Sequence, residues 1–291
     1  MRNQTAQRPR QLLAWIYPNH PREEDSVLLR AQPDDGRGLV VFVHGSTLHQ
    51  SSWLPWAQLF NDNGYESVAV TWTGEPLGEG PARWSDMLRP GPVRLSRVIA
   101  RVHETVSSLS RPSIVIGHGT GALLVEASLG HPLVAAGIAI APTLRGPLPT
   151  VRTALEAYRD LRSRSFADEQ PSSRASFHRW YANEVSREAS DLLYDTYVAP
   201  VQVRRLGRGT ATSGRLDARD PHRPLLLLSA GRDRIVAEAS VASRARRWRS
   251  AYPDETTDHY VFPRRCHALV IDEGWSDVAN HCLDWLTTQG L

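Results

Sequence analysis

Continuous apolar runs of strand length recur along the chain. They predict strands at residues 38–44, 67–71, 114–116, 135–140, 225–229 and 259–262. Runs that are apolar at nearly every position are typical of strands buried on both faces of a parallel sheet. The pattern therefore predicts a parallel sheet at the centre of the chain.

Between these runs, apolar residues recur at three- and four-residue spacing, which is typical of helices that bury one face. The predicted helices cover residues 53–63, 95–109, a segment that begins near 122, and residues 240–252 and 275–289. Strands and helices that alternate at short spacing indicate repeated βαβ units. We therefore expect an α/β fold with a mostly parallel, doubly wound sheet.

The pattern changes between Pro142 and Pro224. This stretch is rich in Arg and aromatic residues and has helical periodicity in places, most clearly from Ser176 to Tyr197. It would lie over the carboxyl edge of the sheet, where open α/β sheets bind ligands. The expected division is an N-terminal arm at 1–24, a core at 25–141 and 225–291, and a helical lid at 142–224.

Composition and charge narrow the class of protein. The chain has 291 residues, of which 41% are hydrophobic, and a net charge of +3. Its Arg residues are interleaved with Asp and Glu, which indicates a mixed solvated surface and argues against nucleic-acid binding. Two cysteines make no disulfide framework. A secretory signal pattern and an apolar run of membrane-spanning length are both lacking, so we expect a cytoplasmic protein that does not bind membranes. The oligomeric state stays open.

Residues 113–125 combine a short buried strand, a glycine-rich turn and the start of a helix. A strand that turns this sharply into a helix needs glycine at both shoulders, and Gly117 and Gly121 supply them. This is the spacing of the G-x-S-x-G nucleophile elbow, whose middle residue is held in a strained conformation above the sheet. The middle residue in this chain is Gly119, which has no hydroxyl.

Two more residues with suitable chemistry follow predicted strands. Asp233 comes shortly after the strand at 225–229, and His267 comes shortly after the strand at 259–262. Taken singly, a turn carboxylate and a loop histidine are ordinary surface features. Taken with the elbow and the His44-Gly45 turn after the first strand, they have the chain order of an acyl-transfer triad. We interpret these positions as one site.

The chain resembles the α/β-hydrolase superfamily, and more closely a group of actinobacterial α/β-hydrolases of about this length. The resemblance implies that Asp233 orients His267 and that the backbone N–H groups of Ser46 and Thr120 form an oxyanion hole. It runs from about Leu39 to Leu291 through Val-His-Gly at 43–45, Ser-Trp at 52–53, Trp72 with Gly-Glu-Pro at 74–76, the elbow, Ile-Ala-Pro at 140–142, and the segments 192–197, 231–233 and 267–275.

Three residues depart from the family pattern: Gly119 stands where the family has Ser, Ala122 where a further Gly is common, and Cys266 where Gly often precedes the histidine. Without a hydroxyl at 119, an acyl-Ser intermediate cannot form at that position. An oriented histidine and an oxyanion hole can still remove a proton and stabilise the resulting enolate or alkoxide.

Cys266, Ser46 and Thr120 are the candidates for a replacement nucleophile, each with a more ordinary role. Cys266 is expected to be a buried small hydrophobe, and the other two are expected to serve the oxyanion hole. His44 and His118 are expected to be structural. The residues that we expect to line the substrate pocket are His49, Trp53, Trp72, Trp180, Tyr181 and Cys266.

The sequence predicts neither a metal nor an organic cofactor. We find no cluster of His, Cys and carboxylate residues with metal-ligand spacing. Gly117, Gly119 and Ala122 satisfy a loose form of the dinucleotide fingerprint, but the next strand ends in Ala141-Pro142, without an acid to hold a ribose.

The leading hypothesis is an enzyme that acts on a small carbonyl-bearing metabolite by proton transfer. The resemblance to actinobacterial proteins implies a specialised metabolite. Cyclisation, elimination, C–C bond cleavage and hydrolysis by a bound water all fit. Two alternatives stay open: a serine esterase whose nucleophile has been replaced by Gly119, and a non-catalytic protein that binds a small molecule.

Overall fold

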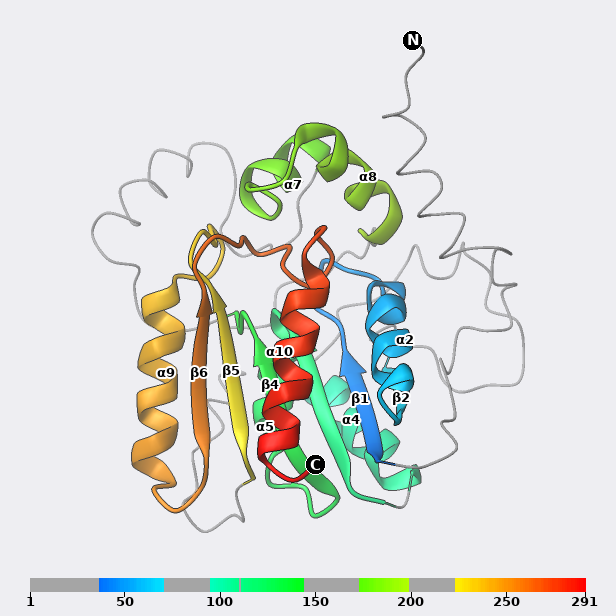
Figure 1. Ribbon diagram of the computed structural model, residues 1–291, viewed down its shortest axis with the longest axis vertical. Helices are drawn as coiled ribbons and strands as arrows, with labels where there is room; N and C mark the ends of the chain where they lie inside the picture. Colours follow the sequence, from blue (N-terminus) through cyan, green and yellow to red (C-terminus); the bar gives the residue numbers. More distant parts are fainter. Residues whose placement is uncertain (1–36, 71–94, 110, 144–172, 199–222) are drawn as a thin grey trace.

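The structure is a computed structural model that describes residues 37–70, 95–109, 111–143, 173–198 and 223–291. Within these ranges six strands form one sheet, in the order β2-β1-β3-β4-β5-β6 (Figure 1). All neighbouring strands are parallel. They are β1 (Gly38–Val43), β2 (Tyr65–Val70), β3 (Ser113–His118), β4 (Val134–Ile140), β5 (Leu225–Ala230) and β6 (Thr257–Phe262). The predicted α/β fold with a parallel sheet is confirmed.

Helices cover both faces of this sheet and bury its apolar side chains in two clusters. Residues of α2 and α10 belong to one cluster, and residues of α4, α5 and α9 belong to the other. The helical segments are η2 (Gln50–Trp53), α2 (Leu54–Asp62), α4 (Leu95–Ser108), α5 (Thr120–Ser128), α7 (Arg174–Trp180), α8 (Arg187–Tyr197), α9 (Glu238–Ala251) and α10 (Trp275–Thr288). The strands are buried on both faces because each face packs against helices, which explains their continuous apolar runs.

The strand order reverses direction at β1 and β3. The chain passes from β1 to β2 on one side and then returns to place β3 on the other side of β1. In a doubly wound sheet, the loops that leave such a switch point diverge and open a crevice at the carboxyl ends of the strands. The loops after β1 and β3 carry Ser46 and Gly119.

Two predictions about helices need correction. The helical stretch expected from Ser176 to Tyr197 is two helices, α7 and α8. The break has a local cause, because the Ser186 side chain accepts a hydrogen bond from the Ala189 amide and so caps a new helix. The helix expected near Ala122 begins earlier, at Thr120, because Gly119 alone completes the turn.

Helices α7 and α8 lie beyond the end of the sheet where the loop after β6 runs (Figure 1). Several predictions lie outside the described residues. They concern the arm at 1–24, the pocket residue Trp72, and the rest of the lid at 142–224 except for the few residues at its two ends. In the part of the chain that the structure describes, no helix is long and apolar enough to cross a membrane.

Candidate active site

The turn from β3 to α5 depends on two glycines. A Cβ placed on Gly117 would overlap the main chain of Gly121, and a Cβ placed on Gly121 would overlap the carbonyl oxygen of Val43. Backbones approach this closely only where no side chain stands between them. The two glycines therefore allow the turn to lie directly against β1, and they restrict the conformation of Gly119, the middle residue between them.

Gly119 is that residue, and it has φ 59° and ψ −121°. Side chains other than hydrogen are strained in this region of positive φ. A Cβ on Gly119 would nevertheless fit without overlap, because it would lie at ordinary contact distances, 3.6 Å from Nε2 of His267 and 3.9 Å from Cα of Gly45. An oxygen bonded to such a Cβ would lie within hydrogen-bonding reach of the imidazole.

His267 and Asp233 form a buried pair beside this position. The His267 Nδ1 lies 2.7 Å from Oδ2 of Asp233, and His267 is 2% exposed. The other carboxylate oxygen of Asp233 accepts hydrogen bonds from the amides of Ile235 and Val236, at 2.7 and 2.8 Å. The carboxylate is thus fixed by its own loop, so it holds the imidazole with Nδ1 protonated and leaves Nε2 as the basic nitrogen on the side of Gly119.

Three buried hydroxyl groups lie close to one another at the elbow. Ser46 Oγ lies 3.3 Å from Thr120 Oγ1, and Thr143 Oγ1 donates to Thr120 Oγ1 at 3.4 Å. The Thr143 amide also donates to the carbonyl oxygen of Gly119, at 3.2 Å. The structure therefore brings together the two residues expected at the oxyanion hole.

Sequence reasoning missed Thr143. It follows β4 by three residues, directly after Ala141-Pro142, the pair that belongs to the family motif. Ala141 has φ 44°, which is uncommon for a residue other than glycine. A polar residue just beyond a strand end at the carboxyl edge was the available signal.

Two other histidines near the site are neutral. Burial lowers the pKa of His44 to about 4, and burial, together with the charge of His267, lowers the pKa of His118 well below its usual value. His44 Nδ1 donates to the Gly45 carbonyl at 2.8 Å, and His118 Nε2 donates to the His267 carbonyl at 3.0 Å, because a carbonyl oxygen can only accept. Both rings thereby support backbone around the site.

Of the predicted pocket residues, some lie near His267 and others lie in the hydrophobic core. Tyr181 lies against the catalytic candidate, with its ring centroid 4.6 Å from that of His267. Trp180 is half-buried, and His49 caps η2 by accepting from the Ser51 amide. Trp53 stacks on Phe42 in the hydrophobic core. The structure thus brings Tyr181 to the site and places Trp53 in the core.

Cys266 also lies in the core and is fully buried, although it precedes His267. Burial raises the pKa of its thiol to about 11. The thiolate is the nucleophilic form of cysteine, so this environment keeps Cys266 in its unreactive form at neutral pH. Its adjacency to His267 in the sequence does not place it in the pocket.

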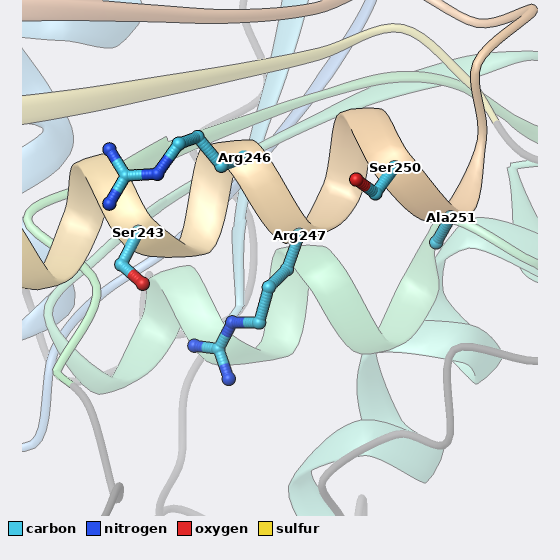
Figure 2. Close-up of a pocket in the computed structure, with 5 residues that line it drawn as sticks. All are labelled: Ser243, Arg246, Arg247, Ser250 and Ala251. Atoms are coloured by element: carbon cyan, nitrogen blue, oxygen red, sulfur yellow. The ribbon is translucent and has the colours of Figure 1, made fainter.

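One other feature of the described residues could hold a ligand, and it is not a metal site. These residues contain no group of three or more His, Cys, Asp and Glu side chains that could hold a metal ion. A shallow surface hollow of about 450 Å³ lies on α9, where Figure 2 shows the guanidinium groups of Arg246 and Arg247 lying apart from each other. Its lining residues are Ser243, Arg246, Arg247, Ser250 and Ala251, none of which belongs to the arrangement around Gly119.

Comparisons with known proteins place this geometry in a family. The model of the alpha/beta hydrolase family matches residues 40–279. A search of curated proteins found no match to the chain.

Similar solved structures agree on the fold. They include MenH from S. aureus, which is 12% identical with a TM-score of 0.63 and covers 91% of this chain and 100% of its own. A lipase-esterase related protein from Clostridium acetobutylicum is 12% identical with a TM-score of 0.62, over 89% and 99% of the two chains. E-2-(acetamidomethylene)succinate hydrolase is 18% identical with a TM-score of 0.57, over 89% and 99%. With a family model that covers most of its length, the chain belongs to the alpha/beta hydrolase family.

Proposed function

We propose that this protein is an enzyme that acts on a small carbonyl-bearing metabolite by acid–base chemistry of His267 and Asp233, without an acyl-Ser intermediate. The observation that carries the proposal is the oriented imidazole, whose Nε2 lies 3.6 Å from the position of a Cβ on a residue that has no side chain. Family membership and the hydrolase and esterase names of similar structures support a carbonyl substrate.

The proposed steps conserve every proton. His267 Nε2 accepts a proton from a bound water or from the substrate, and Asp233 stabilises the imidazolium that forms. Negative charge that develops on the carbonyl oxygen is stabilised by the backbone N–H groups of Ser46 and Thr120. The imidazolium then returns its proton to the leaving group or to the product. Cyclisation, elimination, C–C bond cleavage and hydrolysis by water all follow this scheme.

Several finer assignments belong to the same proposal. The substrate would contact Tyr181, Trp180 and His49, with Trp72 as a further pocket residue, under a lid formed by residues 142–224. The protein would be cytoplasmic, need no cofactor and act in the specialised metabolism of an actinobacterium. These assignments rest on the resemblance and on the placement of α7 and α8.

A second candidate function is ordinary serine hydrolysis by a protein whose serine has been replaced by Gly119. The surroundings of Gly119 support it, since an added Cβ would meet its neighbours at ordinary contact distances. The two candidates differ in the native gene, because codon 119 encodes serine in this second case and glycine in the first.

The test is intact-mass analysis after treatment with a fluorophosphonate probe, which phosphonylates an activated serine. We expect no adduct on the chain as it stands and one adduct on the Gly119→Ser variant, because His267 can activate a hydroxyl at that position. The double variant Gly119→Ser/His267→Ala is the matched control and should stay unlabelled. Labelling of the unchanged chain would reveal a replacement nucleophile and overturn the proposal. A Gly119→Ser variant that folds but stays unlabelled would indicate a binding protein.

A further inference from the structure

The end of α7 and the turn after it contact the loop of Asp233. Arg234 donates from Nη1 to the Arg179 carbonyl at 3.0 Å, and Asn183 donates from Nδ2 to the Arg232 carbonyl at 3.0 Å. These two hydrogen bonds flank Asp233 on its loop. The end of α7 is therefore fixed relative to the carboxylate that orients the imidazole.

Tyr181 lies in the same turn and contacts the loop of His267. Its carbonyl oxygen accepts from the amide of Ala268 at 2.9 Å. Its ring meets the His267 ring edge-to-face, with an interplanar angle of 82°. Phe177 stacks on the Tyr181 ring with its centroid 4.9 Å away, and Tyr181 itself is 2% exposed. The tyrosine ring has little room to move, so it limits the positions open to the imidazole.

The hydroxyl group of Tyr181 adds a second connection, through His118. The Tyr181 hydroxyl oxygen lies 3.4 Å from His118 Nδ1. Since His118 Nε2 donates to the carbonyl oxygen of His267, Nδ1 of the neutral ring is an acceptor and the tyrosine hydroxyl is the donor. The hydrogen bonds run in one direction, from Tyr181 to His118 and from His118 to the main chain of His267.

The end of α8 is attached to the opposite half of the site. The His49 amide donates to the Tyr197 carbonyl at 2.8 Å, and Leu48 forms an antiparallel bridge with Val198. His49 and Leu48 follow Ser46 in the loop after β1. The α7–α8 pair, which lies across the carboxyl edge of the sheet in Figure 1, thus contacts the loops on both sides of Gly119.

We propose that Tyr181 is a positioning residue that keeps Nε2 of His267 directed at the space beside Gly119. Its ring packs on the imidazole, and its hydroxyl donates to the His118 ring that supports the His267 main chain. The proposal rests on the proposed function, in which His267 is the base. A misplacement of about 1 Å in a reacting group costs as much as about 100-fold in rate, so the loss of one such contact has a measurable effect.

The first test uses fluorophosphonate labelling kinetics in the Gly119→Ser background. Tyr181→Phe removes the hydroxyl alone, and Tyr194→Phe is the matched control, because Tyr194 packs edge-to-face on Phe177 at 5.6 Å from within α8. We expect Tyr181→Phe to slow labelling by about tenfold while the final adduct per protein stays complete. An unchanged rate overturns the proposal. A lower final adduct at an unchanged rate also overturns it, since that result reports folding alone.

The second test uses the chain with Gly119 in place. The proton on His267 Nδ1, which is hydrogen-bonded to Oδ2 of Asp233, gives an NMR signal that is sensitive to the geometry of this pair. We expect Tyr181→Phe to shift or broaden that signal and Tyr194→Phe to leave it in place, whereas identical spectra overturn the proposal. If Gly119→Ser is not labelled at all, the proposed function is wrong, and the NMR signal then decides this inference alone.

Discussion

At the scale of single residues, three glycines in one turn have two different physical roles. Gly117 and Gly121 allow backbones to touch, whereas Gly119 leaves a space that a side chain could occupy. We predict that Gly121→Ala prevents stable folding, because the added methyl group would overlap the Val43 carbonyl oxygen. Gly119→Ala should fold, at a cost of about 1–3 kcal/mol for a side chain at positive φ.

Urea denaturation followed by tryptophan fluorescence measures both variants against the unchanged chain. Gly290→Ala is a suitable control for positive φ, because Gly290 has φ 73° and nothing within 4 Å of an added Cβ. Equal stabilities for the Gly119→Ala and Gly121→Ala variants would contradict this account of the turn.

Asp233 is predicted to act by fixing the tautomer of His267. In Asp233→Asn, an amide NH₂ group facing Nδ1 would force that nitrogen to accept, so Nε2 would carry the proton and lose its basicity. In the Gly119→Ser background we expect fluorophosphonate labelling to slow by about 10³- to 10⁴-fold. Asp195→Asn is the control, because Asp195 is an exposed partner of Arg174. A comparable rate in both variants would show that Asp233 does not orient the base.

At the scale of elements, the sequence predicts those strands and helices whose positions follow from the local spacing of apolar residues. Strands such as β1 and β5 are recognisable because both faces are buried and every position is apolar. The break between α7 and α8 was missed because apolar spacing continues through it, and the Ser186 cap gives a weaker signal than the periodicity. The contact between Tyr181 and His118 joins two distant segments, so no local pattern contains it.

One contact between elements has a strong expected effect on stability. Glu126 on α5 is buried, and it accepts from Arg244 Nε at 2.6 Å and from Trp248 Nε1 at 2.8 Å, both on α9. Burial raises the pKa of Glu126, and the charge of Arg244 opposes the rise. Glu126→Ala removes the shared acceptor of both side chains, so we predict a loss of about 3 kcal/mol in the free energy of unfolding.

The control for that variant is Glu104→Ala, which removes an exposed carboxylate from α4. Its unfolding free energy should stay within about 0.5 kcal/mol of the parent value. Urea denaturation at neutral pH measures both variants. Similar losses for the two variants would mean that the attachment of α9 to α5 does not depend on the buried carboxylate.

At the scale of the whole molecule, the candidate site exists because one sheet brings distant residues to one edge. Ser46, Gly119, Thr143, Asp233 and His267 follow β1, β3, β4, β5 and β6 respectively. The sequence predicts the order of four of these residues along the chain, and the parallel sheet predicts that they share an edge. Their distances depend on strand order and on packing such as that of Gly121 against Val43, which only the folded chain contains.

The stability of the whole molecule should fall in mild acid. Burial lowers the pKa of six described histidines, whereas burial raises the pKa of Asp272 to about 6 and also raises that of Glu126. The histidines are His44, His49, His103, His118, His259 and His281. A histidine with a lowered folded-state pKa contributes stability above pH 6.5 and loses it as the pH falls, because the unfolded chain binds the proton first.

The two carboxyl groups act in the opposite direction, since their protonated forms favour the folded state. For His44, the fall in pKa from 6.5 to about 4 corresponds to about 3 kcal/mol, which Asp272 offsets by a similar amount between pH 6 and 4. Since His44 and Asp272 nearly cancel, His118 and the partly buried histidines decide whether the free energy of unfolding rises or falls with pH. We predict that the free energy of unfolding decreases from pH 7 to pH 4.5, as urea denaturation at several pH values would measure. A constant or rising value would contradict the lowered pKa of the buried histidines.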